Sequence, residues 1–288
     1  MYGGDIMKLI VEKDGELLDY LYSHLDMPKK RIKQYLTHGS IYVNNNKTTK
    51  YNEKVVPGMN IVIATDKANS KSLPFDILFE DNHIVVVNKP SGLLTIATEK
   101  EKEKTLYHMV REYLVSKDKH SRIFIVHRLD KDTSGIVIFA KDEKTKNELQ
   151  EHWNEYVSLR EYVAVVHGKM NKPKDKITQY LKETKTNLVY VAKGKDGKEA
   201  ITNYEVLKET EDYSLLKIEI ETGRKNQIRV ALATINHPIV GDKKYSNQKE
   251  TENRLYLHAN RLKLFYPEIK KEILFETPTP SEFKRIMK

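Results

Sequence analysis

The sequence contains no cysteine among its 288 residues. This absence excludes disulfides, thiolate catalysis and cysteine-based zinc or iron–sulfur sites, and it is compatible with a reducing cytoplasm. No apolar run approaches the roughly 18 residues that a membrane-spanning helix needs. The N-terminus also lacks the apolar core of a signal peptide. We therefore expect a soluble, cytoplasmic protein with no membrane partner.

The short motifs of the common cofactor sites are missing too. The ten histidines are scattered, without a His-Glu-x-x-His pair or a carboxylate-rich loop at ligand spacing, so no metal is predicted. Neither Gly-x-x-x-x-Gly-Lys-Ser/Thr nor Gly-x-Gly-x-x-Gly occurs, and no serine lies in a Gly-x-Ser-x-Gly elbow. The remaining possibility is a site without a cofactor, built on a carboxylate.

Charge, in contrast, is abundant and biased in sign. Lysine and arginine number 50 against 41 acidic residues, which gives a net charge of +9, and 32% of the residues are charged. The hydrophobic content of 39% is somewhat lean but sufficient for a globular protein with a heavily solvated surface. A basic excess of this size favours a polyanionic partner such as nucleic acid.

The chain divides into three predicted segments. Residues 1–64 form a small module, in which Leu17, Leu18, Leu21 and Leu25 share one helical face. A second helix after Pro28 turns Ile32, Tyr35 and Leu36 inward, and short strands are predicted at 41–43 and 61–63. Residues 65–73 are polar and lack periodicity, as in a linker.

The third segment, residues 74–288, has the pattern of an α+β domain. Short strands dominate it and parallel βαβ repetition is absent, so a mixed, mainly antiparallel sheet is predicted. The lysine-rich stretch 169–198 has one clear strand pattern, at 188–192, and we interpret it as an excursion from the core.

The stretch "VHRLDKDTSGIV" at 126–137 places ions at the edge of a hydrophobic core. Asp130 follows the predicted strand 123–126 and precedes a Thr-Ser-Gly turn and a second strand, 136–140. An aspartate here has two interpretations: it caps a turn, or it belongs to a site. The residues alone do not separate them.

Longer blocks give a stronger signal. "IVHRLDKDTSGIVIFAKDEKT" resembles the central signature of the RluA family of pseudouridine synthases, which isomerise uridine within RNA. Further blocks resemble that family in the same order: "ILFEDNHIVVVNKPSGLLT", "REYVAVVHG", "GKEAITNYEVL", "TGRKNQIRVALATINHPIVGDKKY" and "LYLHANRLKLFYP". The resemblance covers nearly all of residues 74–270 and implies the pseudouridine synthase fold.

The resemblance also implies roles for individual residues. Asp130 corresponds to the catalytic aspartate, Tyr162 to the active-site tyrosine, and Arg229 to the arginine that pairs with the aspartate. Arg128 corresponds to the arginine that helps displace the target base, while Ile228 and Leu257 occupy the hydrophobic pocket positions. In physical terms, a buried guanidinium opposite Asp130 would counter the desolvation that raises a carboxyl pKa.

The sequence departs from the family pattern in one block. The usual Thr-His becomes Lys225-Asn226, and a later histidine becomes Ala231. Arg224, Gln227 and Arg229 are spared, so we expect activity to survive, but any contact made by the missing imidazoles is in doubt.

The first module carries a second resemblance. "PKKRIKQYLTHGSIYVNNNKTTKYNEKVVPGMNIVI" resembles the RNA-binding module named after small-subunit ribosomal protein four. The exposed side of its second helix carries Lys29, Lys30, Arg31 and Lys33. A charge run is often only a solvated face, but with the resemblance we predict contact with the RNA backbone.

The leading hypothesis is therefore an RNA uridine isomerase that acts, as a monomer, on large-subunit ribosomal RNA. A non-catalytic RNA-binding or ribosome-assembly factor on the same fold is the first alternative, and a hydrolase that releases uracil is the second. Within the enzyme hypothesis, Asp130 either adds to the anomeric carbon or takes a proton from the adjacent ribose carbon.

Overall fold

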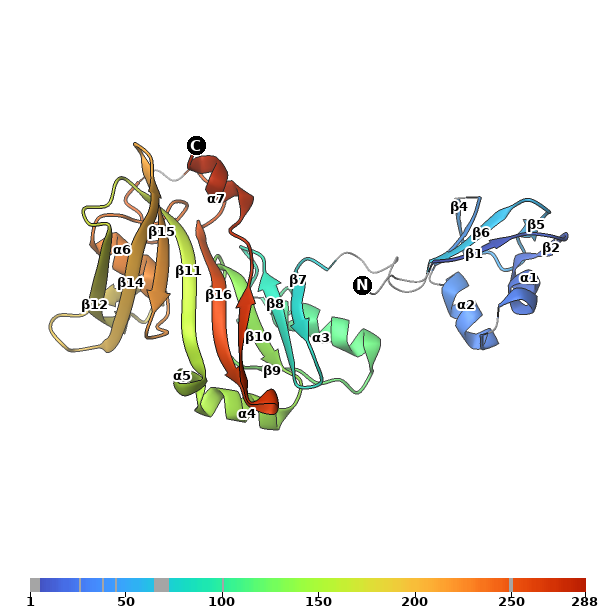
Figure 1. Cartoon of the computed structure of the whole chain (residues 1–288), viewed down its shortest axis with the longest axis horizontal. Coiled ribbons are helices and arrows are strands. Elements are labelled where there is room, and N and C mark those ends of the chain that lie inside the picture. The colour runs from blue at the N-terminus through green and yellow to red at the C-terminus, as the bar shows by residue number, and fades with distance from the viewer. Residues whose placement is uncertain are drawn as a thin grey trace. The chain divides into compact units, whose positions relative to one another are not determined.

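A computed structural model of the chain describes residues 6–25, 27–37, 39–44, 46–64, 73–99, 101–248 and 251–288. The chain divides into two compact units, residues 1–73 and 74–288 (Figure 1). Nearly all of the predicted linker, residues 65–72, lies outside the described residues. The two units are therefore described separately.

The N-terminal unit packs two helices on a small antiparallel sheet. Its sheet has the strand order β1-β6-β3-β4, and a separate pair is formed by β2 and β5. In chain order the elements are β1 (Ile6–Ile10), β2 (Gly15–Glu16), α1 (Leu17–His24), α2 (Lys29–Thr37), β3 (Ile41–Val43), β4 (Asn46–Thr48), β5 (Lys54–Val55) and β6 (Asn60–Ala64).

Amphipathic spacing explains the core of this unit. Helix α2 buries Ile32, Tyr35 and Leu36, as predicted, and it leaves its cationic residues exposed. Helix α1 buries Leu17, Tyr20 and Leu21. Two residues predicted to share its apolar face, Leu18 and Leu25, are only partly buried. Strand β1, which was not predicted, pairs with the whole of β6.

The C-terminal unit is built on one large sheet. Its strands are β7 (Asp76–Glu80), β8 (Ile84–Lys89), β9 (Phe124–Ile125), β10 (Ser134–Ala140), β11 (Val157–His167), β12 (Lys174–Glu183), β13 (Val189–Val191), β14 (Lys198–Glu209), β15 (Tyr213–Ile220), β16 (Leu257–Tyr266) and β17 (Lys271–Glu276). Its helices are α3 (Leu106–Lys117), α4 (Glu143–Glu151), α5 (Trp153–Tyr156), α6 (Gln227–Thr234), the 3-10 turn η1 (Pro267–Ile269) and α7 (Ser281–Ile286).

The strand order is β13-β12-β14-β15-β11-β16-β10-β8-β7, with β17 added to β16 and β9 to β10. Strands β10 and β16 run parallel, and the other described pairs of this sheet are antiparallel. Figure 1 shows α6 beside β12 and β14 at one end of the sheet and α3 near β7 at the other. This is the mixed, mainly antiparallel α+β architecture that was predicted.

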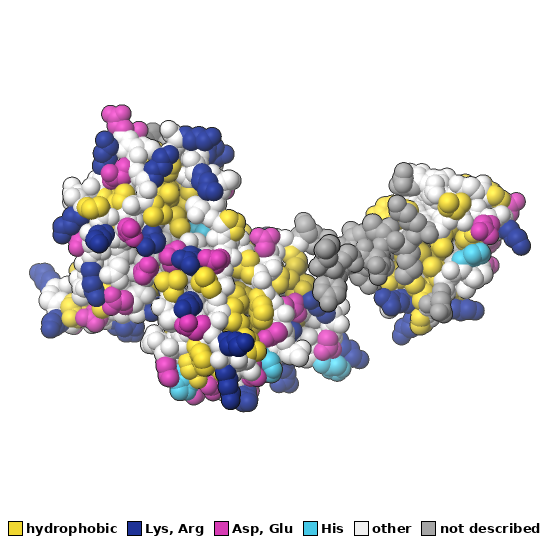
Figure 2. All heavy atoms as spheres, in the orientation of Figure 1, with side chains coloured by type: hydrophobic (Ala, Val, Ile, Leu, Met, Phe, Trp, Pro, Cys, Tyr) yellow, Lys and Arg dark blue, Asp and Glu magenta, His cyan; other side chains and the backbone are white. Residues whose placement is uncertain are grey.

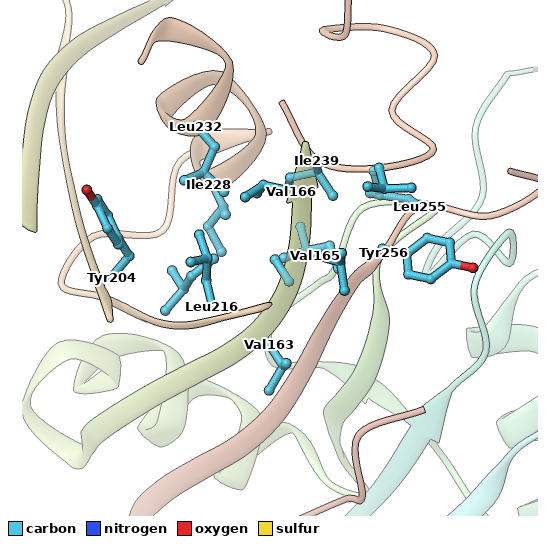
Figure 3. Packing of buried hydrophobic residues seen from close by; sticks show 14 of the residues in the cluster. Val163, Val165, Val166, Tyr204, Leu216, Ile228, Leu232, Ile239, Leu255 and Tyr256 are labelled. Carbon is cyan, nitrogen blue, oxygen red and sulfur yellow. The ribbon is translucent and has the colours of Figure 1, made fainter. Parts of the chain in front are cut away.

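The main core of this unit fixes α6 against the sheet. Ile228 and Leu232 point from the helix toward Val166 of β11 and Leu216 of β15 (Figure 3). Ile228 is 5% exposed and the other three are fully buried. Because protein interiors are close-packed, this contact holds the first turn of α6 in one position, and that turn borders the site described below.

Two predictions for this unit need correction. The stretch 169–198 is no excursion, because β12 pairs with β14 from Lys174 to Leu181 inside the main sheet. Its alternation of lysines with apolar residues hid a strand that is exposed on one face. The predicted strand 123–126 is also shorter, since β9 covers only Phe124–Ile125.

The first residues of β10 include a glycine that the fold requires. Gly135 has φ +119°, and a Cβ atom there would meet the backbone oxygen of Ala259 at 2.1 Å. Gly135 is aligned with Ala259 in the parallel pairing of β10 with β16. The Thr-Ser-Gly segment therefore needs glycine for both conformation and close approach.

Candidate active site

A cavity of about 410 Å³ opens between the 128–133 segment and the first turn of α6. It brings together all six residues predicted to form the site in this unit. They come from four separate parts of the chain: Arg128, Asp130, Tyr162, Ile228, Arg229 and Leu257.

The segment that carries Asp130 has no regular secondary structure, so other residues must hold it. Leu129 is buried, and its backbone N–H and C=O both bond to the hydroxyl of Thr95, at 3.2 and 2.7 Å. The Ser91 hydroxyl donates to the carbonyl of Asp132 at 2.6 Å. The loop after β8 therefore fixes the backbone on both sides of Asp130.

Lys89 completes this support from inside the protein. Its side chain is fully buried, and its ammonium donates to the carbonyls of Pro90, Leu93 and Lys131 at 3.0, 2.7 and 2.8 Å. Burial lowers the pKa of Lys89 to about 7, while the nearby Asp132 and Asp130 oppose that shift. A protonated amine has the three donors that these three carbonyls accept.

Asp130 lies half-buried in the cavity wall. Burial raises the pKa of Asp130 above its ordinary value, and the opposing contributions come first from Arg229 and then from Arg128. The backbone N–H of Asn226 also donates to the carboxylate, and Lys225 adds a further positive charge. Asp130 is thus a partly desolvated carboxylate surrounded by donors and cations, an arrangement in which small changes of environment move its charge state.

The position of Arg229 corrects one expectation. Its guanidinium was expected to pair with Asp130, but it forms a bidentate pair with Asp242, with Nε–Oδ2 at 2.8 Å and Nη2–Oδ1 at 2.7 Å. Both side chains are buried, at 8% and 1% exposure. Arg229 still acts on Asp130 through its charge, while Asp242 provides the bidentate partner that fixes its geometry.

One of the two departures from the family pattern takes part in the same network. Asn226 caps α6 in the left-handed region, at φ 53°, which asparagine tolerates better than most residues. Its Oδ1 accepts from Arg229 Nη1 at 3.1 Å, and its Nδ2 donates to the Tyr245 hydroxyl at 3.0 Å. Asn226 therefore links Arg229 to the N–H that Asp130 accepts.

Tyr162 reaches the cavity from β11, in the middle of the sheet. The pairing of β11 with β16 shifts register between Glu161 and Tyr162, so that Tyr162 lies opposite Ala259. Such bulges re-aim a side chain. Burial raises the pKa of Tyr162 to about 12, partly offset by Arg160 and reinforced by Asp130, so its hydroxyl stays protonated at neutral pH.

The remaining predicted residues divide by burial. Ile228 and Leu257 are 5% and 3% exposed and form an apolar part of the cavity wall. Arg128 is exposed at the cavity. The predicted RNA-binding residues Lys29, Lys30, Arg31 and Lys33 belong to α2 of the other unit.

Sequence reasoning missed Asp242, Lys89, Thr95 and Tyr245 as supports of the site. A signal for Asp242 existed, because this carboxylate follows the apolar run Ile239-Val240 and is 1% exposed. A buried carboxylate requires a partner. The sequence did not show that the partner was Arg229.

Solved structures with the same fold are known. The structure of this protein is similar to that of human RNA pseudouridylate synthase domain containing 4, with a TM-score of 0.61 and 23% identity, over 72% of this chain and 90% of that one. Human RNA pseudouridylate synthase domain containing 1 gives a TM-score of 0.60 at 22% identity, over 72% and 84% of the two chains. At these identities the likeness establishes the fold alone.

Sequence comparison establishes the family. The profile of the RNA pseudouridylate synthases matches residues 83–234, more than half of the chain. The uncharacterized RNA pseudouridine synthase YhcT of Bacillus subtilis is 32% identical over 96% of this chain and 95% of its own length. Ribosomal large subunit pseudouridine synthase D of Yersinia pestis is 31% identical, over 88% and 84%. The chain belongs to the RNA pseudouridylate synthase family, whose members isomerise uridine in RNA.

In the described part of the chain, no helix is both long and apolar enough to cross a membrane.

Proposed function

We propose that this protein converts specific uridines of large-subunit ribosomal RNA to pseudouridine in the cavity around Asp130. The observation that carries the proposal is the convergence of Asp130, Tyr162, Arg229 and two apolar side chains on one cavity of about 410 Å³. The choice of ribosomal RNA is supported by the name of the Yersinia pestis relative.

The reaction breaks the bond between ribose C1′ and uracil N1 and forms a bond between C1′ and C5. The C5 proton then leaves and N1 gains one, so no atom is gained or lost overall. Asp130 acts in its ionised form, either by adding to C1′ or by taking the proton from C2′. The cations near its carboxylate support this role because they favour the charged form against burial.

Entry of the uridine requires its extrusion from the RNA structure, which costs roughly a few kcal/mol. Exposed Arg128 has the length and planar head to occupy the vacated position. Tyr162 offers an aromatic face to the extruded base, and its raised pKa keeps the hydroxyl neutral beside Asp130. Ile228 and Leu257 cover the apolar side of the base.

The N-terminal unit supplies a second RNA contact. Figure 2 shows Lys and Arg side chains gathered where α2 lies, and Lys29, Lys30, Arg31 and Lys33 are exposed there. Arg31 Nε donates to the Tyr35 hydroxyl at 3.0 Å, which orients its guanidinium. We assign this face to the phosphate backbone, where lysine and arginine contribute affinity that falls with salt.

The test is site-resolved mapping of pseudouridine. Large-subunit RNA from cells that lack the protein is incubated with the purified wild type or Asp130→Asn, treated with carbodiimide, and read by reverse transcription. New stops with the wild type only are expected. If no uridine gains a stop, or if Asp130→Asn yields the same stops, the proposal is wrong.

Two further outcomes separate the alternatives. Full rescue of a deletion by Asp130→Asn would favour an assembly factor that binds RNA without modifying it. Free uracil in the reaction mixture would favour hydrolysis.

A further inference from the structure

A second cavity, of about 460 Å³, adjoins the one around Asp130. We call it the flanking cavity. The two cavities share four lining residues: Glu183, Gly223, Arg224 and Lys225. They therefore lie on two sides of one wall, which the end of β12 and the loop before α6 build together.

The wall is closed by an ion pair. The Lys225 ammonium contacts the Glu183 carboxylate and also donates to Asn187 Oδ1 at 2.9 Å. Lys225 and Glu183 are 38% and 40% exposed, so this pair is accessible to solvent and weak. A phosphate oxygen arriving from solvent can replace the Glu183 carboxylate as the partner of Lys225.

The lining of the flanking cavity carries more positive than negative charge. Four cations, from Lys182, Lys198, Arg224 and Lys225, face two carboxylates, from Glu183 and Asp196. Asp196 pairs with Lys182 at 2.5 Å, and Glu183 pairs with Lys225. The remaining excess of positive charge suits one phosphate group.

The flanking cavity also has an apolar part. Leu181 and Val189 line it and are 5% and 4% exposed. Arg224 donates from Nε to the carbonyl of Glu199 at 2.9 Å, which fixes the direction of its guanidinium. Apolar walls with a few oriented polar groups, in a cavity of several hundred Å³, are typical of small-ligand sites.

We propose that the flanking cavity binds the nucleotide next to the target uridine, with its phosphate on Lys198, Arg224 and Lys225 and its ribose against Leu181 and Val189. This inference rests on the proposed function. An extruded uridine remains joined to its neighbours by phosphodiester bonds, so the chain that leaves the Asp130 cavity must cross an adjacent surface. The wall shared by the two cavities provides one, and the Lys225–Glu183 pair opens as the phosphate arrives.

The proposal predicts opposite effects for two single changes. Lys198→Met removes a phosphate contact, so KM for large-subunit RNA rises several-fold and the slope of log KM against log salt falls by about 1. Glu183→Gln removes the competitor for Lys225, so KM falls. Neither change alters kcat beyond about twofold, because neither group touches the reacting atoms.

Lys174→Met is the matched control. Lys174 lies on β12, seven residues before Leu181 of the flanking cavity, or about 23 Å from it at 3.3 Å per residue. It is exposed like Lys198. It should leave both KM and the salt slope unchanged. Circular dichroism of all three variants checks that each is folded.

The outcomes are distinct. If the wild type converts no uridine, the proposed function and the flanking site both fail. If the wild type is active but Lys198→Met behaves like Lys174→Met, or Glu183→Gln raises KM, the flanking site alone is wrong. A higher KM for Lys198→Met with a lower KM for Glu183→Gln supports it.

Discussion

The cationic residues of α2 and those around Asp130 have the same chemistry in different surroundings. On α2, Lys29, Lys30, Arg31 and Lys33 are exposed to solvent, where salt screens a charge within about 10 Å. Around Asp130, Arg229 is buried and held by two hydrogen bonds to Asp242. We expect the first group to attract a polyanion from solvent, whereas the charge of Arg229 partly offsets the effect of burial on the pKa of Asp130. Substitutions on α2 should therefore change KM, whereas substitutions of Asp130 itself or of the buried Asp242 should change kcat or stability.

The strongest test of this difference is Asp130→Asn. Loss of the ionised group should reduce kcat by a factor on the order of 10²–10⁴. Stability at neutral pH should stay level or rise, because burial raises the pKa of Asp130 and its ionised form therefore costs folding free energy above that pKa. Single-turnover conversion and thermal unfolding measure the two quantities. A large loss of stability would show that Asp130 is a structural group.

Asp242→Asn should have the largest effect on stability. It leaves the buried Arg229 guanidinium without the carboxylate that it pairs with, which costs about 3–5 kcal/mol. Because Arg229 also donates to Asn226, the side chain of Asn226 is then held less firmly. Urea unfolding measures the change. Glu276→Gln is the matched control, because its pair with Arg261 is exposed and contributes below about 1 kcal/mol. Equal effects of the two substitutions would contradict the contrast between buried and exposed charge.

The pH dependence of kcat/KM should show the electrostatics of Asp130 directly. Burial raises the pKa of Asp130 above the ordinary 3.8, and the carboxylate is the active form, so activity is lost as the pH falls through that raised value. Lys225→Met removes one of the opposing cations and should move the acid limb to higher pH. Lys174→Met should not move it. If activity is lost only at or below pH 3.8, burial does not raise the pKa of Asp130 and this prediction is wrong.

The smallest effect is expected on α2. The double substitution Lys30→Glu/Lys33→Glu should raise KM several-fold and reduce the salt slope by about 1 for each lost phosphate contact. The value of kcat should remain unchanged, because α2 belongs to the other unit. Lys50→Glu/Lys54→Glu, in the same unit but outside α2, is the control for net charge. A fall in kcat for the α2 variant would contradict the proposed difference between the cations of α2 and those around Asp130.

Secondary structure could be predicted from the sequence where the residues that determine it are near neighbours in the chain. The apolar positions of α2 and the limits of β3 followed from local patterns. Membership of the site followed from motif resemblance, which brought Asp130 together with Arg229 from a distant block. Local patterns failed where the partner is remote: the fork from Arg229 to Asp242, the contact of Lys89 with Lys131, and the pairing of β12 with β14. These contacts depend on tertiary packing between distant parts of the chain, and local patterns in one sequence do not reveal which distant residues meet.

Within the described residues, the hydrogen bonds of the Lys89 ammonium all go to main-chain oxygens, at residues 90, 93 and 131. Every amino acid presents such an oxygen, so these hydrogen bonds do not depend on the identity of the three side chains. Replacing the side chain at position 90, 93 or 131 therefore leaves these acceptors in place, and the backbone that carries Asp130 keeps its support.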